Sequence, residues 1–267
     1  TQATSAYFNA IIGGTTPVGN LIVYGATTTG GSASSITSSG SQTYTGAVTL
    51  AVISTTMTGT DLSFKNAVSG SGLGLTLVSS TSAKFSGTIG ASGSSLGTLS
   101  STGAGSVEFD AAVYAASIAI TCGKCNVNNT VAATSMSVTN SGAFITADAA
   151  NITTSGSFTQ NGTGENQLSG DITATSGTIL FASNVFIAGA VTLNSGSNNI
   201  TCSSDVYISS GGSTIGFTAG TVSVTGNFAL FNGTVTLNAH LTTGKDLILL
   251  SGDTSSMYKD GAGTGGT

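Results

Sequence analysis

The sequence predicts an all-β chain wound as a β-solenoid (a parallel β-helix) or as stacked β-arches, with coils of about 20–22 residues and essentially no helix. Three observations predict this fold class. Glycine, serine and threonine supply 39, 41 and 45 of the 267 residues. Short runs alternate apolar and polar side chains, and turn-forming dipeptides separate these runs. With 39% hydrophobic residues and one proline, the chain does not have the composition of a disordered segment.

A period of two residues marks the expected strands, because successive side chains of a strand point to opposite faces. Each run places Val, Leu, Ile or Phe on one face and mainly Thr, Ser or Asn on the other. No window follows the 3.6-residue period of a helix, and the strong helix formers Glu, Lys and Arg are scarce. The clearest expected strands are residues 48–52, 73–77, 107–113, 118–122, 185–193, 222–230 and 235–241.

Turn chemistry separates these strands. Gly adopts positive φ without steric cost, and Asn or Ser side chains bond to nearby backbone, so Ser-Gly and Asn-Gly steps favour tight turns. Strands of about 4–7 residues, each followed by a bend, are therefore expected. The steps recur at Ser39-Gly40, Ser69-Gly70, Ser141-Gly142, Ser155-Gly156, Asn161-Gly162, Ser176-Gly177, Ser195-Gly196 and Asn232-Gly233.

Degenerate internal repeats indicate the coil length. The pentapeptide Gly46–Leu50 (GAVTL) returns as Gly189–Leu193 and, with one change, as Gly233–Leu237. The last two begin 44 residues apart, which is consistent with two coils of about 22 residues. Ala119–Cys122 (AITC) returns as Asn199–Cys202 (NITC) after 80 residues, which is consistent with four coils of about 20.

These units resemble the coils of large secreted bacterial surface proteins, the filamentous-haemagglutinin-like and autotransporter β-helices. The likeness lies in Ser39–Leu50, in the later Gly-x-Val-x-Leu units and in Ser155–Phe158, and it covers most of residues 36–250. It implies a parallel β-helix, export, and a role in adhesion or surface structure, and it carries over no catalytic residue. In composition and cysteines the chain is also similar to archaeal sheath and surface-layer subunits.

Charge is sparse along the chain. Five lysines and no arginine stand against ten acidic residues, for a net charge of −5. Nucleic-acid binding needs clusters of Lys and Arg on phosphates, so no nucleic-acid partner is expected. Only 6% of residues are charged, against about 25% in typical soluble domains, which leaves little repulsion between copies. No stretch approaches the roughly 20 apolar residues of a spanning helix, so no membrane span is expected.

Glu108 and Asp110 form the one plausible nucleus of a catalytic site. They flank Phe109 on an expected strand, so both carboxylates should point to solvent. Polysaccharide-cleaving β-helices need two or three carboxylates on adjacent coils, often with Arg, Lys or Ca²⁺. The remaining carboxylates are scattered, and the single His240 lies in the outward phase of its strand. The sequence therefore predicts solvated strand residues rather than an enzyme, with no cofactor and no metal.

The three cysteines predict a structural disulfide. Cys122 and Cys125 form a CxxC, but a zinc site needs about two more paired ligands and redox chemistry needs a helix N-terminus. In an oxidising exterior, a local bond between these two is the expected outcome. Cys202 is then left over, either for an intermolecular bond or as a buried free thiol, and its apolar phase favours burial.

Sequons provide candidate glycosylation sites. In a chain rich in Asn and Thr some sequons arise by chance, and they become real sites only where the source glycosylates exported proteins. The candidates are Asn128, Asn151, Asn161, Asn199 and Asn232.

Three segments are expected along the chain. Residues 1–35 are expected to form an N-terminal cap or an exchanged strand, because residues 6–12 and 21–24 are apolar. Residues 36–250 are expected to form the solenoid body, and residues 251–267 a Gly-rich C-terminal tail. The chain starts at Thr1 without a signal peptide, which indicates either an exported protein processed to a mature N-terminus or a trimmed sequence.

Together these observations predict an extracellular, cell-surface structural protein that assembles with copies of itself into a filament, sheath or surface layer. One alternative is an adhesin or passenger fragment of a larger secreted surface protein, with cell-surface glycans or receptors as partners. A third is a polysaccharide-active β-helix enzyme.

Overall fold

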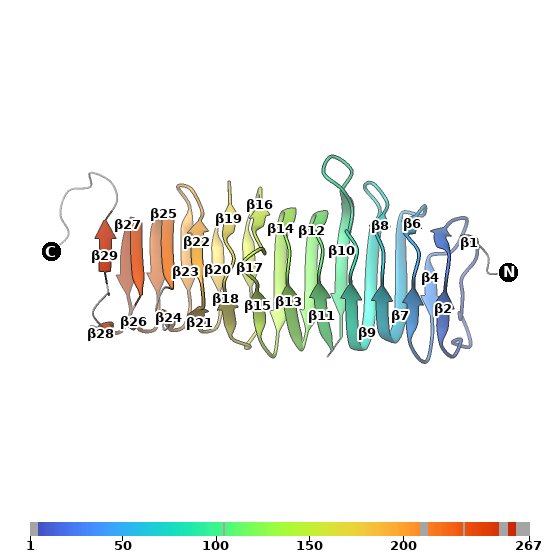
Figure 1. The fold of residues 1–267 in the computed structure, drawn as a ribbon, viewed down its shortest axis with the longest axis horizontal. Coiled ribbons are helices and arrows are strands. Elements are labelled where there is room, and N and C mark those ends of the chain that lie inside the picture. Colours follow the sequence, from blue (N-terminus) through green and yellow to red (C-terminus); the bar gives the residue numbers. More distant parts are fainter. Residues whose placement is uncertain (1–4, 104, 209–212, 232, 251–255, 260–267) are drawn as a thin grey trace.

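The computed structural model describes residues 5–103, 105–208, 213–231, 233–250 and 256–259. These residues form an all-β rod of stacked coils, with the N-terminal coil at one end and the C-terminal coil at the other (Figure 1). Every pairing between its strands is parallel, and the described chain makes about 11 turns. The predicted β-solenoid is confirmed, with no helix among the described residues.

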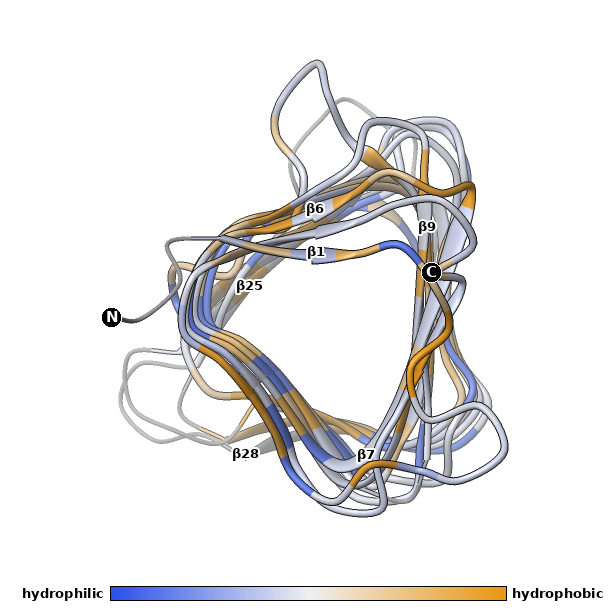
Figure 2. Cartoon of the chain, turned by 90° about the vertical axis from the view of Figure 1, so that its right-hand side faces the viewer, coloured by the Kyte–Doolittle hydropathy of each residue, from blue (hydrophilic) through white to orange (hydrophobic). Residues whose placement is uncertain are grey.

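Viewed down its long axis, the rod has a three-sided outline (Figure 2). We number the sides by their order along each coil. Face 1 contains β1 (Ser5–Phe8), β3 (Ala26–Thr29), β6 (Val48–Leu50), β8 (Val68–Ser69), β16 (Ile152–Thr154), β19 (Ile172–Ala174), β22 (Ala190–Asn194), β29 (Ser256–Lys259) and the first halves of four long strands, β12 (Val113–Cys122), β14 (Val131–Asn140), β25 (Thr214–Val224) and β27 (Thr234–Thr243).

Faces 2 and 3 complete each coil. Face 2 contains β4 (Ser35–Thr37), β10 (Leu96–Thr102), β17 (Phe158–Gln160), β20 (Ile179–Phe181), β23 (Asn199–Cys202), the second halves of the four long strands above, and the first halves of β7 (Ser54–Phe64) and β9 (Gly74–Phe85). Face 3 contains the second halves of β7 and β9 with β2 (Leu21–Val23), β5 (Gln42–Tyr44), β11 (Ser106–Phe109), β13 (Lys124–Val127), β15 (Phe144–Thr146), β18 (Asn166–Leu168), β21 (Val185–Ile187), β24 (Val206–Ile208), β26 (Phe228–Phe231) and β28 (Leu247–Leu250).

The alternation in the sequence decides which side chains fill the rod. On β11, Val107 and Phe109 point inward and are 1% exposed, whereas Glu108 between them points outward. Each inward residue stacks on its equivalent one coil away, so the core is a set of columns along the axis. Burial of these columns supplies the main stabilisation, because a buried Val, Leu or Phe side chain contributes roughly 1.5–3 kcal/mol.

The GxVTL repeats all lie on face 1, and the two copies that begin 44 residues apart occupy equivalent places, as their spacing predicted. The second and third copies are equivalent, since Val191 aligns through Ile215 with Val235. The first copy shares face 1 but is shifted by one inward position, because Val48 aligns through the intervening strands with Leu193. The AITC repeats share face 2 but not the register that their letters suggest. Through the intervening strands Cys202 aligns with Ile120 rather than with Cys122, a shift of one inward position, because the intervening coils are on average longer than 20 residues.

Residues 5–35, expected as a cap or exchanged strand, run in the same ladder as the body, with β1 paired to β3 and β2 to β5. In the segment expected as a tail, β29 pairs with β27. The other residues of that segment, 251–255 and 260–267, lie outside the described residues.

Candidate functional site

A charged cluster on face 3 joins the two carboxylates that the sequence singled out. Lys84 on β9 lies in register with Glu108 on β11. Its Nζ is 2.9 Å from Glu108 Oε2 and 2.9 Å from Asp110 Oδ2. Asn128, one coil further on, donates its Nδ2–H to Asp110 Oδ1 at 2.9 Å and to Glu108 Oε1 at 3.4 Å. The two carboxylates face outward as expected, but they are ion-paired rather than free in solvent.

The electrostatics of this cluster favour its charged forms. Hydrogen bonds to Glu108 and Asp110 raise the pKa of Lys84 above its ordinary value. For Asp110, burial pushes the pKa upward, but the hydrogen bonds from Lys84 and Asn128 outweigh it and leave the pKa lowered. A carboxyl that donates a proton at neutral pH needs a raised pKa, so Asp110 lacks the tuning of a general acid. The arrangement is that of a structural ion pair.

Three carboxylates that look isolated in the sequence also have partners in the fold. Ser82 donates to Asp61 Oδ1 at 2.7 Å, and the Thr192 N–H donates to Asp171 Oδ1 at 2.6 Å. Asp205 accepts from the Asn227 N–H at 2.6 Å and from the Tyr207 hydroxyl at 2.7 Å. The Asn227 N–H and then the Tyr207 hydroxyl lower the pKa of Asp205, against the opposing effect of burial. These carboxylates therefore tie one coil to the next or brace a neighbouring side chain.

The predicted disulfide is wrong, because all three cysteines are free and buried. Cys122 ends β12 and Cys125 lies in β13, so both thiols lie inside the same corner of the coil. A hydrogen bond between them lowers the pKa of Cys122 and, together with burial, raises that of Cys125. Cys202 is a buried free thiol, one of the two outcomes expected for it, and burial raises its pKa to about 12.

The sequons differ in accessibility. Asn151, Asn161 and Asn199 are exposed. Asn128 is half-buried, and its Nδ2, the atom that would carry a glycan, already donates to the Lys84 cluster. Asn232 lies outside the described residues. His240 is exposed on β27, as its phase predicted.

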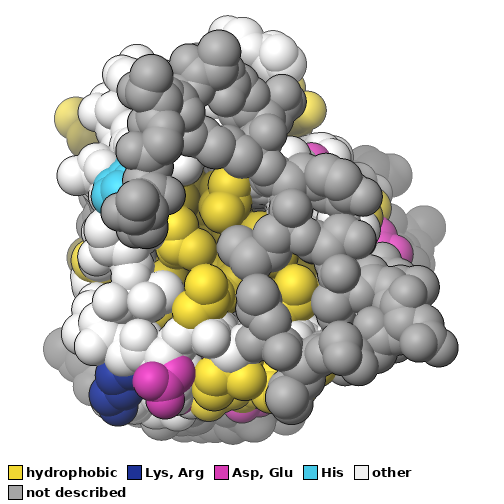
Figure 3. All heavy atoms as spheres, turned by 90° about the vertical axis from the view of Figure 1, so that its left-hand side faces the viewer, with side chains coloured by type: hydrophobic (Ala, Val, Ile, Leu, Met, Phe, Trp, Pro, Cys, Tyr) yellow, Lys and Arg dark blue, Asp and Glu magenta, His cyan; other side chains and the backbone are white. Residues whose placement is uncertain are grey.

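Core residues near the two ends of the described part of the rod are less buried than those in its middle. Inward-facing residues of the middle coils are almost completely buried, whereas Ala6, Phe8, Ile12 and Leu21 on the first described coil are only partly buried. Near the C-terminal end, Leu237, Ala239 and Leu241 on β27 are also only partly buried. Figure 3 shows hydrophobic side chains in the centre of this C-terminal end. Among the described strands, β1 and β2 at the N-terminal end and β28 and β29 at the C-terminal end each pair with one strand only.

The fold and its surface define a β-solenoid with a mostly hydroxyl-bearing exterior and apolar ends. Comparisons with protein-family models, with curated proteins and with solved structures found no match. The resemblance to bacterial surface β-helices and the likeness to archaeal sheath subunits therefore stay predictions. Within the described ranges, no helix has the length and apolar character to cross a membrane, and no three His, Cys, Asp or Glu residues group as metal ligands would.

Proposed function

We propose that the protein is an extracellular structural subunit that stacks head to tail with copies of itself to build a filament, sheath or surface layer. The observation that carries this proposal is the partial exposure of core residues at both ends of the rod. A solenoid coil buries its inner face only when a coil lies above and below it, so an end coil is completed by another coil.

The two ends match each other in strand direction and in chemistry. Because all strands of the rod are parallel, the last coil of one copy can continue the ladder into the first coil of the next. On face 1 the last described strand is β29, which pairs with β27, so β1 of the next copy would continue the ladder from β29. Such a contact joins two different surfaces, so it repeats without closing and generates an open polymer.

The first coils also lack the devices that keep a sheet edge from pairing. Natural edge strands commonly carry charged residues that discourage association. Here the first charged residue of the chain is Asp61, so the N-terminal coils have none. Two large apolar side chains on these coils face outward, with Tyr7 67% and Ile22 53% exposed. A surface without charged residues and with exposed apolar side chains favours contact with another copy over contact with solvent.

The test is negative-stain electron microscopy with sedimentation velocity on the purified chain and on three variants. Phe8→Lys and Leu241→Lys place a charge in the end columns, and Thr153→Lys places the same charge on an exposed site in the middle of the rod. We expect regular polymers from the wild type and from Thr153→Lys, and separate short rods from the two end variants. Separate rods from the wild type at high concentration would contradict the proposal and favour the adhesin alternative.

A further inference from the structure

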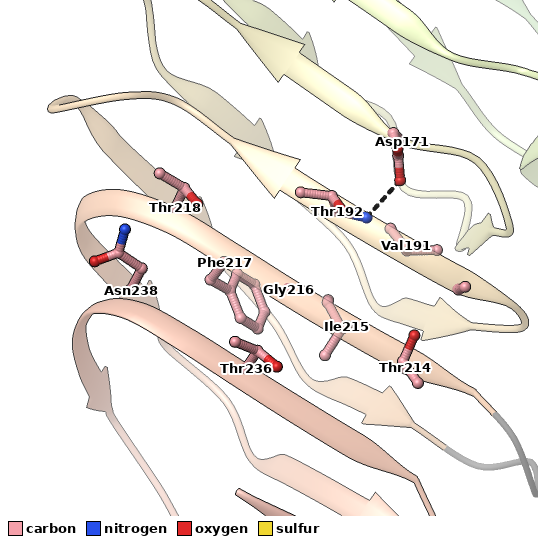
Figure 4. A pocket seen from close by; sticks show the side chains of 11 residues that line it. Asp171, Val191, Thr192, Thr214, Ile215, Gly216, Phe217, Thr218, Thr236 and Asn238 are labelled. Carbon is pink, nitrogen blue, oxygen red and sulfur yellow. Dashed lines mark hydrogen bonds between the residues drawn. The ribbon is translucent and has the colours of Figure 1, made fainter. Parts of the chain in front are cut away.

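A groove on face 1, toward the C-terminal end, is open to solvent and has a volume of about 500 Å³ (Figure 4). It runs across β22, β25 and β27, and Asp171, just before β19, lies at its edge. This volume is within the range of roughly 300–1,000 Å³ found for small-molecule sites. The groove is separate from the Lys84 cluster, and on β27 it uses the outward-facing Thr236 and Asn238 rather than the inward-facing Leu237 and Ala239.

Gly216 creates the groove. It occupies the outward position between Thr192 on β22 and Thr236 on β27, to which it is directly registered. A glycine inside a strand weakens the strand and often marks a place where a ligand or another backbone approaches closely. The row of threonine side chains therefore has a gap at Gly216, and the groove lies over this gap.

Nothing inside the molecule requires glycine at this position. A Cβ on Gly216 would have as its nearest neighbours Thr192 Oγ1 at 3.8 Å and Thr192 Cγ2 at 3.9 Å. By contrast, a Cβ on Gly59 would lie 2.7 Å from Ser38 Oγ, and one on Gly97 would lie 2.4 Å from a backbone oxygen. Those two glycines are needed for packing between coils, whereas Gly216 leaves room that the fold does not use.

Polar groups around this gap are free to bind a ligand. Within the described part of the chain, no hydrogen bond engages the side chains of Thr192, Thr236 or Asn238. Asp171 uses Oδ1 to accept the Thr192 N–H at 2.6 Å, and its other oxygen has no described partner (Figure 4). The apolar part of the lining comes from the exposed Ala190 and from the Gly216 backbone. Val191 and Ile215 also line the floor, but their side chains face the core and are 2% and 1% exposed.

The lining selects the class of ligand by its chemistry. It contains no Lys, Arg or His, so it offers no counter-charge to an anion. A single carboxylate with one oxygen already engaged is a poor cation site, since Ca²⁺ takes six to eight oxygen ligands. A purely apolar ligand would leave the hydroxyls and the amide unpaired, at a cost in desolvation. A neutral polyhydroxylated molecule can donate to and accept from these groups and place its C–H face on the floor.

We propose that the groove over Gly216 binds one or two units of a neutral glycan. Thr192, Thr236 and Asn238 bond to its hydroxyls, and the free oxygen of Asp171 accepts from one of them. The inference is independent of head-to-tail assembly, because its residues are outward-facing and do not belong to the end columns.

The test uses saturation-transfer NMR with a panel of neutral oligosaccharides built from glucose, galactose, mannose and N-acetylglucosamine, followed by titration of the best binder. Gly216→Thr fills the gap with the residue that its neighbours already carry, and a β-branched residue suits a strand, so the variant should unfold no earlier than the wild type. Thr236→Val removes one hydroxyl with little change of shape. Thr153→Val makes the same change on face 1 outside the groove.

We expect at least one oligosaccharide to bind the wild type, with Gly216→Thr weakening the affinity by about tenfold or more and Thr236→Val by several-fold. Thr153→Val should bind as the wild type does. The proposal is overturned if no oligosaccharide of the panel binds, or if Gly216→Thr binds with unchanged affinity while remaining folded. Polymer formation by Gly216→Thr is measured in parallel. A loss of glycan binding can then be distinguished from a loss of assembly.

Discussion

Phe64 and Phe85 stack almost parallel, one coil apart, with ring centroids 4.6 Å apart and an interplanar angle of 6°. Tyr44 extends the stack on one side at 5.2 Å, and Phe109 extends it on the other at 5.6 Å. The four rings form a column along the inside of face 3, and all are essentially buried. Aromatic pairs add about 0.5–1.5 kcal/mol each beyond the area they bury, so this column is a main support of the N-terminal half.

Phe85→Ala should therefore destabilise the rod strongly. It removes the ring that contacts both Phe64 and Phe109 and leaves a cavity that the flanking coils cannot fill. A loss of about 3–5 kcal/mol in the free energy of unfolding is expected, measured by chemical denaturation. Ile53→Ala is the control, since Ile53 is 87% exposed and should change stability by less than about 0.5 kcal/mol. A loss below about 1 kcal/mol for Phe85→Ala would show that the column is not a main support.

The Lys84 cluster predicts a specific dependence of stability on pH. The pKa of Asp110 is lowered in the folded protein, so its contribution is fully present above the unfolded value of about 3.9 and is lost as pH falls through the lowered value. The pKa of Lys84 is raised, so its contribution is present below about 10.4 and is lost as pH rises through the raised value.

Asp110→Asn should weaken the pH dependence of the free energy of unfolding in the acidic range, which we call the acid limb. It should also lower that free energy by about 0.5–1 kcal/mol at neutral pH, a small amount because the pair is partly exposed. The measurement is the free energy of unfolding between about pH 2 and 7. Asp148→Asn, at an exposed carboxylate outside the cluster, serves as the control. Identical acid limbs for Asp110→Asn and the wild type would rule out the assigned role.

Gln160 is a buried amide that holds a corner of the coil. Its Nε2 donates to Asn140 Oδ1 at 2.8 Å and to the Gly162 carbonyl at 2.9 Å, and its Oε1 accepts the Ala182 N–H at 3.0 Å. Gln160→Leu would leave Asn140 Oδ1 and the Gly162 carbonyl unpaired inside the rod, whereas the Ala182 N–H keeps its bond to the Gln160 carbonyl, so a loss of at least about 2 kcal/mol is expected. The control Gln167→Leu changes an outward-facing amide on a neighbouring strand. Similar losses for both variants would show that the buried network is not responsible.

Thiol reactivity should separate the three cysteines. Cys202 is fully inside and its pKa is raised to about 12, so it should resist a thiol reagent at pH 8 until the protein unfolds. Cys122 has a lowered pKa and is 4% exposed, so it should react first among the three. Mass spectrometry of labelled peptides over time gives the order. Labelling of Cys202 in the folded protein at the rate of the unfolded chain would contradict this assignment.

Much of the fold could be read from local patterns. The alternation in residues 222–230 and 235–241 predicted which side chains enter the core, because a strand has a strict period of two. The GxVTL spacing predicted coils of about 22 residues, and those repeats do share face 1. The AITC spacing misled by one inward position, because coil length varies and a repeat of letters does not report that variation.

The candidate sites were less accessible to sequence reasoning. Glu108 and Asp110 were identified from their spacing, but Lys84 lies 24 residues away from Glu108 and joins it only through the parallel register. Gly216 was not identified, although a glycine at an outward position between Thr214 and Thr218 was a usable signal. The disulfide was predicted from the CxxC spacing, whereas the fold places both thiols inside a corner as a hydrogen-bonded, unbridged pair.

The sequence by itself determined that this chain forms strands, where they bend and which face each residue takes, because these properties depend on near neighbours and on turn chemistry. Only the tertiary structure decided which coil positions stack, and with them the Phe64–Phe85 column, the Lys84 cluster and the gap at Gly216. Register between coils depends on the length of every intervening turn. Small differences in turn length accumulate over the coils that separate two residues, and they decide whether those residues align.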